Sequence, residues 1–272
     1  MLTFAALLIA LAVIPPLEAR FGPRPRSRPI RANLVLVPIV LAASAVFGLV
    51  EVASLDLVES RGFGLIPWLG LDGAAALVVA LIGLDLVAYT GHRIRHRFSP
   101  LWAMHRTHHT DLDVDVTTTL RHHPGDIAML VVMGALGMLV LGCTAAHVAA
   151  FAVPSLFFGV FDHVRFQLPL RVERVLGLVF QTPGLHRVHH SPNRVETDSN
   201  FGLVLTLWDR LFGTFTPVST WGEVGLDTLD IQERQSVGAM LLEPWRPMVR
   251  PAPAEPVAPV EPPLVSAGVA GA

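Results

Sequence analysis

Histidines recur at helical spacing in three segments of this sequence. Residues 105–109 read HRTHH, residues 186–190 read HRVHH, and His92 and His96 form an HxxxH pair within HRIRHR. Side chains three or four residues apart share one face of a helix, about 5–6 Å apart at Cβ. Imidazoles at these spacings can converge on one metal ion or on two adjacent ones, and imidazole suits zinc, copper, iron and nickel.

The number of histidines bears on how many metal ions the chain could hold. One HxxHH segment alone would fit a polar interfacial helix with incidental histidines, but two such segments and an HxxxH pair favour a metal site. Eight clustered imidazoles exceed the four or so ligands of one closed site, so two ions are implied. No Glu lies within these segments, and the single cysteine, Cys143, lies in an apolar run. The predicted ligand shell is therefore built from histidine.

The four remaining histidines have different expected roles. His123 precedes Pro124, which biases it away from helical backbone and suits a ligand delivered from a loop, whereas His122 is expected to point elsewhere. His163, in FDHVRF, is expected to join the ligands. His147 stands alone and is most simply an interfacial residue.

Asp85 lies inside an apolar segment, two and three helical turns before His92 and His96. A carboxylate within a membrane helix is costly and usually faces a partner in the bundle. Two interpretations remain open: it accepts an imidazole N–H, or it makes an interhelical hydrogen bond as a protonated acid.

The composition predicts a membrane protein. Of 272 residues, 52% are hydrophobic and 15% charged, and the mean hydropathy is +0.53, which is too apolar for an ordinary soluble domain. The net charge of -2 argues against a nucleic-acid partner.

Four apolar stretches could supply the membrane helices: residues 2–17, 34–50, 74–89 and 127–161. Crossing a bilayer takes about 20 helical residues. The first three stretches are each long enough for one short span, and the fourth for a tight helical hairpin bent near Gly142-Cys143-Thr144. The expected fold is an all-α, polytopic membrane helical bundle with a cytoplasmic histidine-rich cap that binds two metal ions.

The arginines predict the orientation. Five arginines, from Arg20 to Arg31, separate the first two stretches, so the positive-inside rule places that linker in the cytoplasm. The third stretch then delivers HRIRHR to the cytoplasmic side, and the hairpin returns there. A signal peptide is the alternative for the first stretch, although no basic segment precedes it. We expect an integral protein of the bacterial inner membrane.

Four regions are predicted along the chain. Residues 1–70 hold the N-terminal spans and the arginine-rich loop, 71–216 the catalytic region, and 217–246 a C-terminal extension. Residues 247–272 are Pro/Ala-rich and are expected to be disordered. Within the catalytic region, apolar residues between Arg171 and Phe180 repeat at helical spacing, which predicts a short helix lying in the membrane interface.

The ordered set HRIRH, HRTHH, RHHP, DHVRF and LHRVHH, followed by TDSNFG and WDRLFGTF, resembles the fatty acid hydroxylase and sterol desaturase superfamily of membrane di-iron enzymes. The resemblance covers about residues 80–216. It implies ten iron ligands, which are also the expected catalytic residues: His92, His96, His105, His108, His109, His123, His163, His186, His189 and His190. It also matches Asp198 and Asn200, which with Asp85 are expected to support the ligands, and a closing motif of Trp208, Asp209 and Arg210. Arg165 departs from the pattern, because an Asn is common there.

The resemblance implies a non-haem di-iron oxidoreductase that hydroxylates or desaturates a lipid-like substrate, such as a sterol or fatty acyl chain. It would use two irons, O₂ and an external electron donor of the ferredoxin, cytochrome or reductase type, with the lipid entering from the membrane. The alternative is a non-catalytic membrane protein that binds or transports zinc or iron, whose ligands should lie near the bilayer midplane. A haem cytochrome would need only two axial histidines per haem.

Overall fold

The structure, a computed structural model, describes residues 2–23, 30–226 and 231–247. Throughout these ranges the fold is helical, and extended pairing is limited to one bridge between Phe180 and Leu205. The α-helices are α1 (Leu2–Phe21), α2 (Ile30–Arg61), α3 (Leu65–Trp68), α4 (Gly73–Arg97), α5 (Ser99–His109), α6 (Pro124–Leu141), α7 (Ala145–Phe161), α8 (Leu170–Leu176), α9 (Pro183–His189), α10 (Arg194–Thr197), α11 (Leu207–Leu211) and α12 (Val237–Leu242). The 3-10 helices are η1 (Val116–Leu120), η2 (Ile231–Gln235) and η3 (Glu243–Trp245). The predicted all-α class is confirmed.

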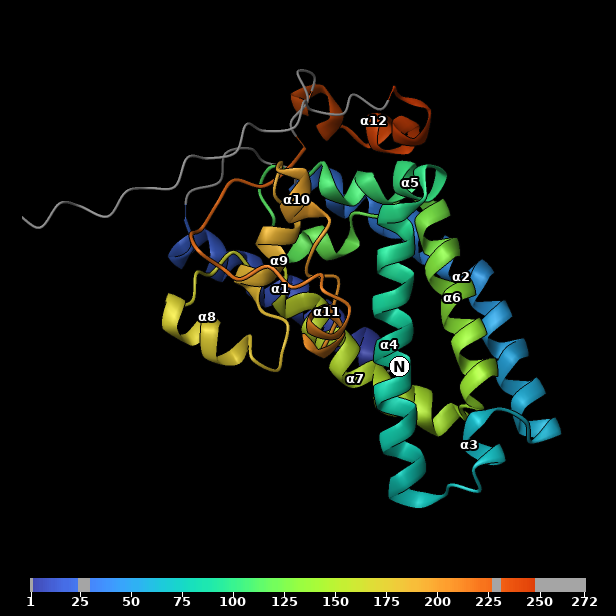
Figure 1. Cartoon of the computed structure of the whole chain (residues 1–272). Helices are drawn as coiled ribbons and strands as arrows, with labels where there is room; N and C mark the ends of the chain where they lie inside the picture. Colours follow the sequence, from blue (N-terminus) through green and yellow to red (C-terminus); the bar gives the residue numbers. More distant parts are fainter. Residues whose placement is uncertain (1, 24–29, 227–230, 248–272) are drawn as a thin grey trace, which may run out of the picture.

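The long helices α2, α4 and α6 stand side by side (Figure 1). Three helical segments, Ala32–Trp68, Gly73–Arg97 and Pro124–Leu141, are long and apolar enough to cross a membrane. Their outer faces are apolar as well, since Val46, Leu49 and Val140 are all more than three-fifths exposed. An apolar surface of this kind is expected where helices face lipid rather than water.

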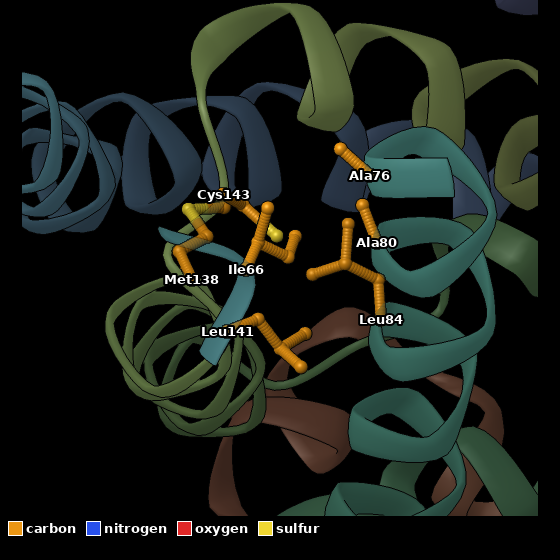
Figure 2. Close-up of a cluster of buried hydrophobic side chains, with 7 residues drawn as sticks. All are labelled: Ile66, Ala76, Ala80, Leu84, Met138, Leu141 and Cys143. Carbon is orange, nitrogen blue, oxygen red and sulfur yellow. The ribbon is translucent and has the colours of Figure 1, made fainter. Parts of the chain in front are cut away.

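The lower end of the bundle in Figure 1 is closed by an apolar cluster (Figure 2). Small side chains on α4, Ala76 and Ala80, face Met138 and Leu141 of α6, with Cys143 completing the cluster. The small residues let the two helices approach closely, as is common between membrane helices. This packing fixes α4 against α6 far from the histidines.

The predicted break between α6 and α7 is confirmed. Gly142 has a φ of 73° and lies against residues 63–64, where an added Cβ would be 2.6 Å from the carbonyl oxygen of Phe63. Thr144 then caps α7 by accepting the N–H of His147. The expected tight hairpin is not formed, because α7 inclines away from α6 and packs against α4, α1 and η1 (Figure 1).

α1 is joined to the cap of the bundle by a buried carboxylate. Glu18 Oε1 accepts the backbone N–H of Arg165 at 2.8 Å and that of Val116 at 3.4 Å. Because this contact joins α1 to the segment after α7 and to the first residue of η1, α1 is part of the same folded unit. That the first apolar stretch spans the membrane stays a prediction.

The predicted interfacial helix corresponds to α8, which is shorter than expected and ends in a turn at Gly177. Its apolar residues Val172 and Val175 are exposed, whereas Glu173 is buried against the N–H of Gly184. A helix that exposes its apolar side chains and buries its acid suits a lipid surface.

The C-terminal extension covers α5 (Figure 1). Arg106 donates to the backbone oxygen of Glu243 and pairs with its carboxylate at 2.9 Å, and Thr107 donates to the oxygen of Met240. Gln235 donates to the oxygen of Thr110 at 2.7 Å. These contacts make η2, α12 and η3 a lid over the histidine-bearing helix. The predicted region boundaries stay predictions, and the tail beyond residue 247 lies outside the described residues.

Candidate metal centre

Nine histidines from four parts of the chain meet in one buried cluster at the upper end of the bundle. They come from the last turns of α4, from α5, from the segment after α7, and from α9 with its C-terminal cap. Within each of two groups, one ligand atom per residue lies within 4.8 Å of every other: His92, His96, His105, His109 and His189 form group A, and His108, His163, His186 and His190 form group B. The helical spacings put the histidines of each segment on one face, and the fold brings these three segments into one cluster.

In group A the imidazoles turn nitrogens toward one another. Nε2 of His92 lies 3.1 Å from Nε2 of His105. Two nitrogens that bind the same metal ion at 2.0–2.1 Å lie about 3 Å apart. The separation of His92 and His105 therefore fits a metal ion shared by the two rings. Nε2 of His96 and Nε2 of His189 are buried without a hydrogen-bond partner. Buried polar atoms of this kind ordinarily have a partner, and a cation supplies one.

Group B shows the same pattern more completely. Nε2 of His163 lies 3.1 Å from Nε2 of His108 and 3.0 Å from Nε2 of His186, and the latter lies 3.1 Å from Nε2 of His190. Two neutral imidazoles can share only one proton, so a chain of four facing nitrogens is poorly satisfied by hydrogen bonds alone. A transition metal ion bound among these four nitrogens would satisfy their lone pairs.

His109 lies between the groups. Its ring is 4.8 Å from that of His96 in group A and 4.4 Å from that of His190 in group B. Both of its nitrogens are buried without a hydrogen-bond partner. The two groups are contiguous through His109 and also through His105 and His108, whose rings lie 5.5 Å apart.

Backbone oxygens fix the tautomer of three histidines. Nδ1 of His92 lies 3.1 Å from the oxygen of Phe201, Nδ1 of His189 lies 2.7 Å from that of Ser199, and Nδ1 of His163 lies 2.7 Å from that of Gly159. A carbonyl can only accept, so the proton is on Nδ1 and the lone pair of Nε2 points inward. Such outer partners orient metal-bound histidines and raise their basicity.

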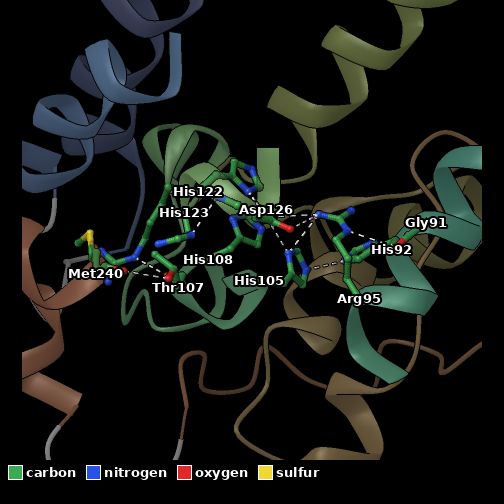
Figure 3. A network of polar contacts seen from close by, with 12 residues as sticks. Gly91, His92, Arg95, His105, Thr107, His108, His122, His123, Asp126 and Met240 are labelled. Atoms are coloured by element: carbon green, nitrogen blue, oxygen red, sulfur yellow. Dashed lines mark hydrogen bonds and ion pairs between the residues drawn. The ribbon is translucent and has the colours of Figure 1, made fainter. Parts of the chain in front are cut away.

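A buried carboxylate orients a fourth histidine. Asp126, in the first turn of α6, lies 3.1 Å from Nδ1 of His105, 2.7 Å from Nδ1 of His122 and 3.1 Å from NH1 of Arg95 (Figure 3). Because Nε2 of His105 faces His92, its proton belongs on Nδ1 and is donated to Asp126. Sequence reasoning missed this residue, although an acid three positions after His123, within RHHPGD, was a usable signal.

Asp198 lies where the resemblance places it, with Oδ1 3.4 Å from Nδ1 of His96 and Oδ2 accepting from Arg194 at 2.9 Å. Asn200 touches no imidazole. It has a φ of 52° and donates to the oxygens of Leu185 and Thr216. It thereby holds the backbone whose flanking oxygens receive His189 and His92.

Two acids of the predicted set brace the loop after Asn200. Asp209 accepts the backbone N–H groups of Phe201 and Gly202, each at 2.8 Å. Asp85 differs from both expectations, because it accepts from the N–H of Val204 at 3.1 Å and from the indole of Trp208 at 3.0 Å rather than from an imidazole. Asp85 does form a hydrogen bond between two helices, α4 and α11, but its carboxylate accepts this bond, whereas a protonated acid was expected to donate it.

The structure places His122 beside the histidine cluster and His123 away from it, the reverse of the expected positions. Nδ1 of His123 accepts the N–H of Gly125 at the start of α6, and its ring lies 6.1 Å from Trp245, outside both groups. His122, expected to point elsewhere, stacks on His108 with ring centroids 4.8 Å apart. The proline fixes the backbone direction at this helix start, and that direction sends His122 inward and His123 outward.

Arg165, the departure from the family pattern, serves the scaffold. It donates to Asp115 at 3.2 Å, and its own N–H is held by Glu18. His163 still reaches group B. His147 caps the start of α7 as a helix-end residue, far along that helix from the cluster.

Burial keeps the imidazoles neutral. It lowers the pKa of His105 to about 3 and that of His163 to about 4. Burial likewise lowers the pKa of His108, His186 and His190 well below the usual value, with neighbouring histidines adding to the effect. The neutral form is the one that binds metal ions.

Taken together, the inward lone pairs, the unpartnered nitrogens and the outward acceptors fit two bound transition-metal ions. An all-nitrogen shell is compatible with iron or zinc, so the donor atoms alone leave the metal open.

Comparison with known proteins narrows the chemistry. Residues 77–214 match the profile of the fatty acid hydroxylase family. The alkylglycerol monooxygenase of Danio rerio is 32% identical over 160 residues, which is 57% of this chain and 33% of that protein. The ornithine lipid hydroxylase OlsE of Rhizobium tropici is 33% identical over 142 residues, 52% of this chain and 42% of that protein. A cholesterol 25-hydroxylase-like protein of Danio rerio is 27% identical over 161 residues, 58% of this chain and 59% of that protein.

The chain thus spans about a third to three-fifths of the length of these relatives. No solved structure matches it.

Proposed function

The chain belongs to the fatty acid hydroxylase family, and from this premise we propose that it is a membrane di-iron oxygenase that oxidises a C–H bond of a lipid. Its described part is helical and includes three helices able to cross a membrane. The buried histidine groups lie at one end of this helical bundle. The proposed reaction consumes a C–H bond, O₂, two electrons and two protons, and yields a C–OH group and water. Desaturation would remove two hydrogens instead.

One observation carries this proposal: in two adjacent groups of five and four histidines, one ring nitrogen per residue lies within 4.8 Å of every other. Iron ions bound there would activate O₂, the oxidant of the reaction, which no side chain can do. Nine of the ten predicted histidines lie in the two groups and form the proposed ligand set, whereas His123 lies outside both groups.

The chain's own residues prepare the site. Burial keeps the imidazoles unprotonated, and the acceptors of His92, His105 and His189 hold their rings in place. The lid of η2, α12 and η3 covers α5 and limits the access of water from that side. A dry, oriented shell lets the oxidant react with substrate rather than with solvent.

The orientation in the membrane is also proposed. The arginine-rich linker before α2 places the histidine end on the cytoplasmic side of a bacterial inner membrane. A lipid could then enter from the bilayer while its polar end stays at the surface. The two electrons would come from a separate donor of the ferredoxin, cytochrome or reductase type.

The substrate class is a lipid, since the relatives are named for alkylglycerol, ornithine lipid and cholesterol. The test compares lipid extracts of cells that express the wild type or His186→Ala, grown under isotopically labelled O₂. We expect a lipid that gains one labelled oxygen, or loses two hydrogens, only with the wild type. Identical extracts, with wild-type protein present and iron-loaded, would contradict the proposal.

A further inference from the structure

A cavity of about 310 Å³ adjoins group A on its outer side. Its lining includes His96, Asp198, Trp102 and Phe201. Because His96 belongs to group A, the cavity directly contacts the candidate metal centre, and the Trp102 ring lies 4.7 Å from that of His96. A volume of this size holds a small polar group rather than an entire lipid.

Three arginines line this cavity: Arg93 and Arg97 from the last turns of α4, and Arg194 from α10. Arg194 pairs with Asp198 at 2.9 Å. Arg93 donates to the hydroxyl of Tyr89 at 3.4 Å, and within the described part of the chain neither Arg93 nor Arg97 forms an ion pair. Asp198 is the one carboxylate that lines the cavity with the three arginines. Burial raises the pKa of the nearby Asp209 carboxyl, and Arg93 lies near enough to oppose that rise. The cavity lining therefore carries an excess of positive charge.

The orientation of the chain in the membrane explains only part of the clustering of these three arginines. Arginines at the end of a membrane helix are expected from the positive-inside rule. That rule does not require Arg93 and Arg97 to share a cavity with Arg194, about a hundred residues later in the chain, or with a histidine of the candidate metal site. Convergence of guanidinium groups is, by contrast, how proteins recognise phosphate and carboxylate.

The surroundings place the arginines at the level of lipid headgroups. Phe98 follows Arg97 and is 56% exposed, and Val195 follows Arg194 and is 77% exposed. Exposed apolar side chains next to arginines at the end of a membrane helix are typical of the headgroup boundary, where the apolar part enters the membrane and the charge stays at its surface.

We propose that the cavity formed by Arg93, Arg97 and Arg194 binds the anionic headgroup, a phosphate or carboxylate, of the lipid substrate. The inference rests on the proposed function in taking that lipid as the substrate. An acidic electron-donor protein would also be attracted to arginines, but it would need a broad surface, whereas these line a cavity of limited size. The headgroup would be held beside group A, so the substrate would be fixed by its polar end.

The test measures binding by the full-length, iron-loaded protein in neutral detergent, without turnover. The probes are dioctanoyl phosphatidic acid, its uncharged counterpart dioctanoylglycerol, and inorganic phosphate. The test variant is Arg93→Gln/Arg97→Gln, and the matched control is Arg171→Gln/Arg174→Gln, which removes two exposed arginines from α8. The iron content shows whether each variant retains its fold. If the glutamine variant does not retain iron, Arg93→Lys/Arg97→Lys is the test variant in its place.

We expect phosphatidic acid to bind the wild type and the control alike, and to bind the glutamine variant about tenfold or more weakly. The lysine variant should bind at an intermediate level, because it keeps the charge and loses the bidentate geometry. Dioctanoylglycerol and inorganic phosphate should bind far more weakly than phosphatidic acid.

Three results would overturn the proposal. Equal binding of dioctanoylglycerol would show that charge is not recognised, and equal binding of inorganic phosphate would indicate a free-anion site. Unchanged phosphatidic acid binding by the glutamine variant would show that Arg93 and Arg97 do not hold the headgroup. Because binding is measured without turnover, unchanged lipid extracts in cells would count against the proposed function and leave this result standing.

Discussion

Asp126 offers the sharpest test of how the scaffold supports the metal groups. Its two carboxylate oxygens face three donors: Nδ1 of His105, Nδ1 of His122 and NH1 of Arg95. In Asp126→Asn one oxygen becomes an NH₂ group, which cannot accept. At least one of the three donors is then left facing another donor in a buried site.

The size of the effect follows from these contacts. Loss of an outer partner of a metal-bound histidine typically weakens metal binding by about 10–100-fold. Among the group A histidines, Asp126 orients only His105. The affinity for the ion in group A should therefore fall, and the affinity for the ion in group B should not. Asp126→Ala also leaves Arg95, itself 6% exposed, as an unpaired buried charge, at a cost of about 3–5 kcal/mol in the free energy of unfolding.

The assay is a chelator competition titration of the purified, metal-free chain, which resolves the affinity of each ion. Asp72→Asn is the matched control, because Asp72 is exposed at the opposite end of α4 and makes no side-chain cap bond. Arg95→Met/Asp126→Asn separates the two effects, since it removes the unpaired charge but not the defect at His105. If both affinities in Asp126→Asn stay within about twofold of wild type, the proposed orienting role is refuted.

Three further predictions concern the cluster, the loop and the pH response. His189→Ala should lose metal from group A, whereas His123→Ala should keep wild-type metal content by mass spectrometry of the purified chain; the reverse pattern would restore His123 as a ligand and remove His189. Asp209→Asn should lower the free energy of unfolding by about 1–3 kcal/mol and weaken metal binding, because the loop that presents the oxygen acceptor of His92 loses its support; calorimetry showing unchanged stability would contradict this. In the metal-free chain, burial lowers the pKa of His105 to about 3, so only the unfolded state takes up a proton below its usual value of 6.5. The free energy of unfolding should be level above about pH 7 and fall from pH 6.5 toward 4, by about 1.4 kcal/mol per pH unit for each such histidine, and the thermal midpoint should fall with it. A flat profile of the thermal midpoint over that range would show that the imidazoles are not held neutral.

The sequence was most informative where helical periodicity decides position. Three- and four-residue spacings put His105 with His109, and His186 with His190, on common faces, and the structure brings both pairs into the cluster. The bend at Gly142 was equally accessible, because the surrounding run was too long for one span and the residue types there end helices.

The remainder depended on contacts that side-chain identity does not reveal. The partners of His92 and His189 are backbone oxygens, so no residue type marks them. His122 and His123 are adjacent, and only the direction of the backbone before Pro124 decides which one faces His108. Asp85 lies on α4, the helix that carries His92 and His96, but its carboxylate accepts the N–H of Leu205, 120 residues later in the chain, and not an imidazole N–H.

The C-terminal extension was likewise beyond sequence reasoning. Its contacts with α5 join Thr107 to Met240 and Arg106 to Glu243 across more than 130 positions. These residues carry no motif of their own. Their role follows only from the packing of the lid.

The metal content of the purified chain tests the central claim most directly. Two irons per chain by elemental analysis, with no haem Soret band and an iron absorption-edge spectrum fitted by nitrogen neighbours at about 2.0–2.2 Å, are the predicted result. A haem Soret band, a single ion per chain, or loosely exchanging zinc that iron cannot replace would contradict the assignment of the two histidine groups as a di-iron centre.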